Sequence, residues 1–137
     1  MSRMNKVVIT EFGDESKLAI VEDDLPDPAA GEVQLSVEYS IVSGSDVNMR
    51  RGTYPFQREA SNYCPRICSS GLANEPPSPP LVEELIMPDL ELLFEWLRSG
   101  NISVPIKATF RLEEIQEAHR EYASSSRLGS IVIEINR

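Results

Sequence analysis

The sequence predicts an α+β fold, mostly antiparallel in its first half, with two helices and a closing strand at its C-terminal end. Apolar residues alternate with polar ones between positions 33 and 41, which is typical of a half-buried strand. Apolar residues then recur at helical spacing after Pro88, and a run of β-type residues precedes the C-terminus. With 137 residues, 41% of them hydrophobic, the chain is long enough for one core.

Three strands are predicted in the first segment. Residues 6–12 and 18–21 are rich in Val, Ile and Leu, and the residues between them, Gly13–Ser16, are typical of a turn. The long strand after them carries apolar side chains on one face, which we expect to pack on a core: Val33, Leu35, Val37, Tyr39 and Ile41. Residues 43–51 are expected to form a loop with about one helical turn.

The middle of the chain, residues 59–87, has a different composition. Four prolines stand close together at 76, 77, 79 and 80, and few residues there are spaced to form an apolar face. We expect a linker that joins residues 1–58 and 88–137, which would be two parts of one domain. A connection of this length without structure is unusual inside a compact domain.

The C-terminal segment contains two helical patterns and a strand. Asp89 is a good N-cap, and Gly100 is well placed to end the first helix. A second helix is predicted over residues 112–124, and a final strand over 129–135. The first helix carries an apolar stripe, and Trp96 adjoins it: Leu90, Leu93, Phe94 and Leu97.

Charge and composition exclude several classes of function. The formal net charge of -9 opposes sequence-independent binding to nucleic acid or anionic lipid. No apolar run is long enough to cross a membrane, so we expect a cytoplasmic protein without a membrane partner. In that compartment Cys64 and Cys68 are expected to be free thiols. His119 is the only histidine, so no multi-histidine metal site is expected.

Two stretches carry a family resemblance. The first runs from Leu25-Pro26-Asp27-Pro28 through Gly31-Glu32-Val33 to Ser45-Asp46 and Gly52-Thr53-Tyr54-Pro55. The second comprises residues 109–119 and 128–132. Together they resemble the beginning and the end of the GroES-like catalytic domain of medium-chain dehydrogenases/reductases, of the zinc-free quinone-oxidoreductase and enoyl-reductase type. The resemblance implies a partial GroES-like β-structure.

The nucleotide-binding middle of that family is not recognisable. The seven glycines stand at positions 13, 31, 44, 52, 71, 100 and 129, too far apart for a Gly-x-Gly-x-x-Gly turn. Intact relatives use NADPH, but without such a turn we expect no cofactor to be bound by this chain. The chain is therefore expected to be a truncated relative that lacks the Rossmann domain.

The resemblance also suggests site residues. Ser43 stands where zinc-containing relatives have a cysteine ligand, and a hydroxyl is a poor zinc donor, so no metal is expected. Ser45, Asp46 and Tyr54 are the catalytic candidates, and Ser43, Arg50 and Arg51 are the candidates for substrate binding. A Ser beside an Asp can pass a proton or polarise a carbonyl. The alternatives are that Asp46 caps a helical turn, that Tyr54 lies at a wet rim, and that His119 is structural.

Three functions remain open at this point. The first is a truncated oxidoreductase relative that keeps part of the substrate side, accepts a small carbonyl compound, and has no independent hydride transfer. The second is a non-catalytic binding or dimerisation module, in which the apolar stripe of residues 90–97 supports a homo-oligomer. The third is a cofactor-independent isomerase or cyclase that uses Ser45, Asp46 and Tyr54. NADPH titration separates the first of these functions from the other two.

Overall fold

The computed structural model describes residues 3–30, 33–55, 70–73, 87–124 and 128–135. These residues form a mixed α+β structure, which confirms the predicted fold class. The elements in chain order are β1 (Arg3–Ile9), η1 (Glu15–Lys17), β2 (Leu18–Asp24), β3 (Val33–Ser36), β4 (Tyr39–Val42), α1 (Gly44–Arg51), β5 (Ser70–Ala73), α3 (Met87–Ser99), β6 (Ile106–Arg111), η3 (Leu112–Glu114), α4 (Ile115–Ser124) and β7 (Ser130–Glu134).

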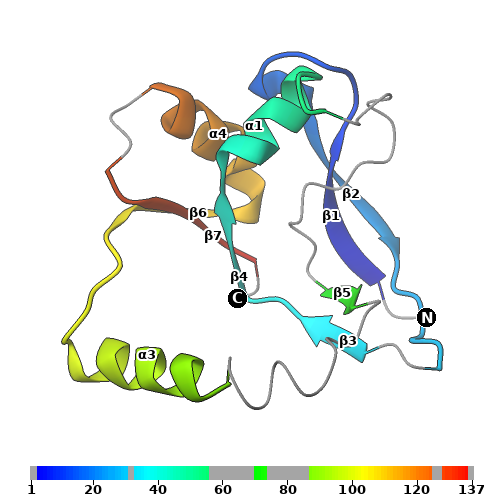
Figure 1. The fold of residues 1–137 in the computed structure, drawn as a ribbon. Coiled ribbons are helices and arrows are strands. Elements are labelled where there is room, and N and C mark those ends of the chain that lie inside the picture. Colours follow the sequence, from blue (N-terminus) through cyan, green and yellow to red (C-terminus); the bar gives the residue numbers. More distant parts are fainter. Residues whose placement is uncertain (1–2, 31–32, 56–69, 74–86, 125–127, 136–137) are drawn as a thin grey trace.

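The described strands form three small sheets (Figure 1). β1 and β2 make an antiparallel hairpin, and β3 pairs antiparallel with β5. The third, which we call the central sheet, has the order β4-β7-β6. β4 runs antiparallel to β7, whereas β6 runs parallel to it, with an irregularity between Ile106 and Ala108. The central sheet thus joins residues from the two ends of the chain.

The core lies between the central sheet, the hairpin and α4. Gln116 of α4 donates from its side-chain amide to the Leu18 carbonyl at 2.9 Å, which fixes α4 against the start of β2. The predicted last helix is confirmed, with its first turn a 3-10 helix. The buried apolar cluster contains Val7, Ile9, Leu18, Val42, Met49, Leu112, Ile115, Ala118, Ile131 and Ile133.

The long strand predicted over residues 33–41 is two strands in two sheets. β3 ends at Ser36, and β4 begins at Tyr39. The expectation that its apolar face packs on the core is wrong: Leu35, Tyr39 and Ile41 are exposed, and Val42 is the buried residue of β4. The reason is that α4 packs against the other face of the central sheet, where Val42 lies.

Other boundaries differ from the predictions in smaller ways. Residues 44–51 form a full helix, α1, rather than a loop with one turn. β6 was not anticipated, and β5 lies within the expected linker. α3 starts at Met87, two residues before Asp89, and is followed by Gly100 with a φ of 76°. The Pro-rich cluster, Cys64 and Cys68 lie outside the described residues.

None of the helices that the structure describes is both long and apolar enough to cross a membrane.

Candidate functional site

The candidate site is built on α1, which is fixed at both ends. Ser43 is the N-cap with extended backbone, and its N–H donates to the Asp46 carboxylate at 2.8 Å. Gly52 ends the helix with a φ of 70°, and its N–H donates to the Met49 carbonyl at 3.0 Å. The geometry therefore shows Asp46 as a capping residue of α1.

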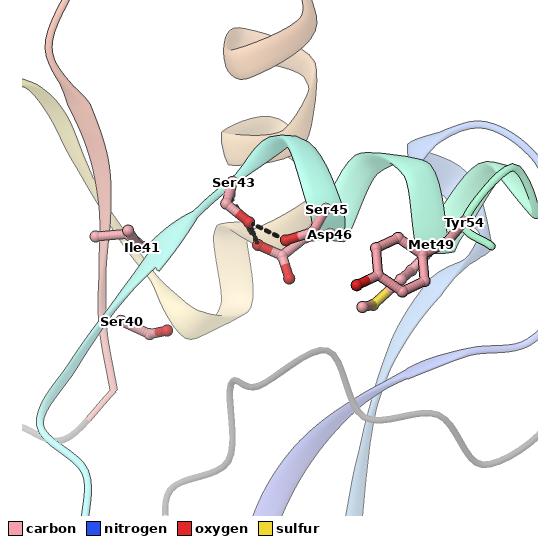
Figure 2. Close-up of a pocket in the computed structure, with 7 residues that line it drawn as sticks. All are labelled: Ser40, Ile41, Ser43, Ser45, Asp46, Met49 and Tyr54. Carbon is pink, nitrogen blue, oxygen red and sulfur yellow. Dashed lines mark hydrogen bonds between the residues drawn. The ribbon is translucent and has the colours of Figure 1, made fainter. Parts of the chain in front are cut away.

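A short chain of polar groups leads from the helix N-terminus into the solvent (Figure 2). The Ser43 hydroxyl donates to Oδ2 of Asp46 at 2.6 Å. The hydroxyls of Ser43 and Ser45 are 2.7 Å apart. The Ser43 hydroxyl already donates its hydrogen bond to the carboxylate. The Ser45 hydroxyl is therefore the one that can donate a hydrogen bond to the oxygen of a ligand.

These groups line a cavity of about 300 Å³ beside the end of β4. Tyr54 and Met49 form the wall across from the serine hydroxyls, and the phenol of Tyr54 points into the space (Figure 2). The lining residues are Ser40, Ile41, Ser43, Ser45, Asp46, Met49 and Tyr54. Four of the six candidate residues predicted from sequence thus come together around one cavity.

Ser40, Ile41 and Met49 were not among the sequence candidates. Ser40 lies on the polar side of the alternating pattern, and that position was a usable signal for a side chain near the site. Ile41 was assigned to a core face and is 56% exposed instead. Met49 carries no signal in the sequence that separates it from an ordinary helical core residue.

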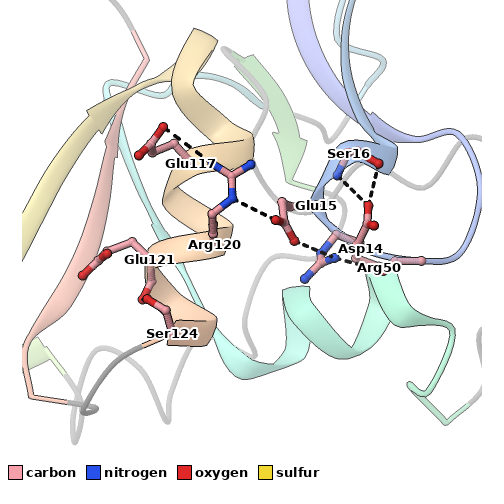
Figure 3. Close-up of polar contacts among 9 residues, drawn as sticks. Asp14, Glu15, Ser16, Arg50, Glu117, Arg120, Glu121 and Ser124 are labelled. Carbon is pink, nitrogen blue, oxygen red and sulfur yellow. Dashed lines mark hydrogen bonds and ion pairs between the residues drawn. The ribbon is translucent and has the colours of Figure 1, made fainter.

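Arg50 does not lie at the cavity, contrary to the expectation that it binds substrate. Its side chain is 1% exposed, and its Nη1 donates to the Gly13 carbonyl at 2.9 Å. The same nitrogen is 3.8 Å from the Glu15 carboxylate (Figure 3). Burial lowers the pKa of Arg50, and Glu15 opposes that shift. Arg51, also a substrate-binding candidate, is exposed and does not line the cavity either.

His119 is fully buried in α4, which fits the structural role expected for it. Burial is the main cause that lowers the pKa of His119 to about 4, and the nearby Arg50 lowers it further. Neither ring nitrogen has a hydrogen-bond partner among the described residues. The imidazole is therefore neutral near pH 7.

The donor groups at this site do not fit a zinc ion. Zinc prefers thiolate and imidazole, but the helix N-terminus offers the hydroxyls of Ser43 and Ser45 and a carboxylate already used as a cap. The imidazole of His119 is enclosed in the core. Within the described ranges, no group of three or more His, Cys, Asp and Glu side chains is arranged to hold a metal.

A dinucleotide does not fit the start of α1 either. A pyrophosphate needs free backbone N–H groups at a helix N-terminus and glycines that allow a close approach. Here the Asp46 carboxylate already accepts the Ser43 N–H. The glycine spacing over the whole sequence offers no other such turn.

Comparison with known proteins places these observations in a family. Residues 44–133, about two thirds of the chain, match a family model described as zinc-binding dehydrogenase. The starvation-sensing protein RspB of Escherichia coli (strain K12) is 44% identical over 43 residues. Those residues are 31% of this chain and only 13% of RspB.

A solved structure supports the fold. The human synaptic vesicle membrane protein VAT-1 homolog-like protein superposes with a TM-score of 0.76 at 10% sequence identity. The alignment covers 100% of this chain and 99% of that chain. At this identity the likeness concerns the fold alone.

Proposed function

The chain belongs to the zinc-binding dehydrogenase family, within the medium-chain dehydrogenases/reductases, and we propose that it binds a small carbonyl compound without transferring hydride. In this proposal it is a truncated, zinc-free relative of NADPH-dependent quinone and enoyl reductases, it acts in the cytoplasm, and it keeps part of their substrate side. The observation that carries the proposal is the Ser45–Ser43–Asp46 chain of polar groups at the cavity.

The chemistry of the cavity suits a carbonyl oxygen. Ser45 can turn its proton from Ser43 to a ligand, while Asp46 keeps Ser43 in place. Tyr54 offers a second hydroxyl donor from across the cavity. Met49 supplies apolar surface for the carbon skeleton, so the cavity combines a few polar groups with an apolar wall.

The fit described above supports the second part of the proposal, that the cofactor role is lost. Asp46 occupies the N-terminus of α1 and the sequence contains no glycine-rich turn, and both observations support a chain that does not hold NADPH. Reduction of a bound carbonyl would then need a hydride donor held elsewhere. The proposed activity is binding and polarisation of the ligand.

Saturation-transfer NMR with cyclohexanone as the probe tests the binding. We expect saturable binding of cyclohexanone. Its affinity should fall about tenfold in Ser45→Ala and in Tyr54→Phe, because each change removes one hydroxyl donor. Arg51→Gln is the matched control outside the cavity and should leave the signal unchanged. Equal signals for all four proteins would contradict the proposal.

Titration with NADPH tests the second part of the proposal, the loss of the cofactor role. We expect no saturable change in nucleotide fluorescence with the full chain. Saturable binding at micromolar NADPH would overturn the claim that the cofactor role is lost. If cyclohexenone is converted without NADPH and Asp46→Asn stops that conversion, the isomerase alternative replaces this proposal.

A further inference from the structure

An amphipathic helix and a sheet face both present apolar side chains to solvent in this chain. The stripe of α3 is formed by residues at i, i+3, i+4 and i+7 spacing, and no α3 residue is buried. Its members, with Met87 extending the line, are exposed by between 37% and 51%: Leu90, Leu93, Phe94 and Leu97. An amphipathic helix is normally stabilised by packing of this face.

Among the described residues, the central sheet has one face covered by a helix and one face that no helix or strand covers. α4 packs on the face that carries Val42, Ile131 and Ile133. On the other face, Ile41 lies opposite Val132, and Val132 lies opposite Thr109, so three strands contribute to one row. This face has an apolar groove of about 430 Å³, which we call the sheet groove, lined by Tyr39, Ser40, Ile41, Ile106, Thr109 and Val132.

α3 lies apart from the central sheet (Figure 1), and backbone hydrogen bonds are present at both ends of the connection that joins it to β6. At the helix end, the Gly100 N–H donates to the Leu97 carbonyl and the Ile102 N–H donates to the Trp96 carbonyl, both at 3.3 Å. At the strand end, the Ser130 N–H donates to the Pro105 carbonyl at 2.8 Å. These bonds tie residues 100–102 to the end of α3 and Pro105 to β7, and in this structure the stripe of α3 and the sheet groove do not cover each other.

We propose that two copies of the chain form a reciprocal dimer, in which α3 of each copy lies in the sheet groove of the other. Each contact removes two solvent-exposed apolar faces from water. Because the dimer is twofold symmetric, the same contact occurs twice. The exposed apolar side chains of the stripe and the groove offer on the order of 1,000 Å² per copy, compared with about 800 Å² per partner in a stable interface.

Charge gives the dimer a distinctive salt dependence. Each copy carries a formal net charge of -9, so two copies repel one another at low ionic strength. Salt screens that repulsion, and the apolar contact itself is not weakened by screening. The dimer should therefore tighten as sodium chloride is added, whereas a dimer held by ion pairs would loosen.

Sedimentation velocity on the full chain, over a hundredfold range of concentration, tests the proposal. We expect a monomer–dimer equilibrium whose dissociation constant rises about 30-fold in Phe94→Lys, on the stripe, and in Ile41→Asp, in the groove. Glu95→Gln, on the polar side of α3, is the matched control and should have little effect. Thr109→Arg provides a second groove variant if Ile41→Asp does not fold by circular dichroism.

Mixing the two variants gives the sharpest result. A Phe94→Lys copy and an Ile41→Asp copy can form one wild-type contact and one Lys–Asp contact, so the mixture should dimerise where each alone does not. A wild-type monomer at all concentrations overturns the proposal. So does an Ile41→Asp dimer as tight as wild type, because that result would mean that α3 pairs with α3.

Discussion

Glu15 accepts a hydrogen bond from Nε of Arg120 at 2.9 Å, across 105 residues of sequence (Figure 3). The other carboxylate oxygen lies 3.8 Å from the buried Arg50, so one acidic residue faces two cations on two helices. The largest cause that lowers the pKa of Glu15 is the hydrogen bond that its carboxylate accepts from its own backbone N–H. The hydrogen bond from Arg120 is the second. η1, α1 and α4 are thereby held at one point.

Glu15→Gln should destabilise the fold by about 2 kcal/mol, because the buried guanidinium of Arg50 loses its nearest carboxylate. Arg120→Gln should cost under about 1 kcal/mol, since Arg120 is 56% exposed and its pair with Glu15 is solvated. Urea unfolding measures both. An equal loss in the free energy of unfolding for the two variants would show that the contact of Glu15 with the buried Arg50 contributes no more than its contact with Arg120.

The stability should fall as the pH drops from about 6.5 to 4, and His119 is the cause. The pKa of His119 is lowered to about 4 in the fold, so between these values the unfolded chain binds a proton that the folded chain does not. Its contribution is complete above pH 6.5 and decreases by about 3 kcal/mol towards pH 4. Thermal or urea unfolding across that range measures the slope.

His119→Leu is the matched variant for this pH dependence. It removes the titrating group together with two buried nitrogens that have no partner among the described residues. The slope between pH 6.5 and 4 should flatten, with little loss of stability at pH 7. A slope that persists in this variant would assign it to the carboxylates instead.

Gly52 and Gly100 allow backbone strain to be separated from crowding. Both have a positive φ, 70° and 76°. A Cβ at Gly52 would lie 2.7 Å from the Phe12 ring, whereas one at Gly100 would meet nothing within 4 Å. Gly100→Ala should cost about 1 kcal/mol and Gly52→Ala about 2–3 kcal/mol, as measured by urea unfolding. Similar losses would mean that Phe12 moves aside freely.

Capping and ligand binding at α1 should respond to different substitutions. Asp46→Ala removes the acceptor of the Ser43 N–H and should destabilise the protein by about 1 kcal/mol. Ser45→Ala changes an exposed hydroxyl and should alter stability by less than about 0.5 kcal/mol. Thermal unfolding of both variants checks this. A Ser45→Ala loss as large as that of Asp46→Ala would make Ser45 part of the cap.

The sequence allowed the fold class and the last helix to be predicted because these depend on local periodicity. Leu112, Ile115 and Ala118 are buried, as their helical spacing indicates. The orientation of β4 was not predictable in this way. Alternation shows that Tyr39 and Ile41 share a face, but only the tertiary position of α4 decides which face is covered.

The same distinction applies to the site. Ser43, Ser45, Asp46 and Tyr54 are close in sequence and lie within or next to a single helix, so their grouping was predictable. Arg50 stands four residues after Asp46, on the same helix, and nothing local shows that Gly13 and Glu15 lie opposite it. A long-range contact thus turned a candidate ligand-binding arginine into a buried structural one.

The core described above comes from residues 7–49 and 112–133, with no described member between them. Closing a flexible segment between two paired ends costs free energy only as the logarithm of its length, about 0.6 kcal/mol for each doubling. A core of this kind therefore tolerates an insertion of very different length between its two parts, from a short peptide to a whole domain. Separately produced fragments 1–55 and 87–137 should therefore associate and fold together, even with no covalent connection between the two ends.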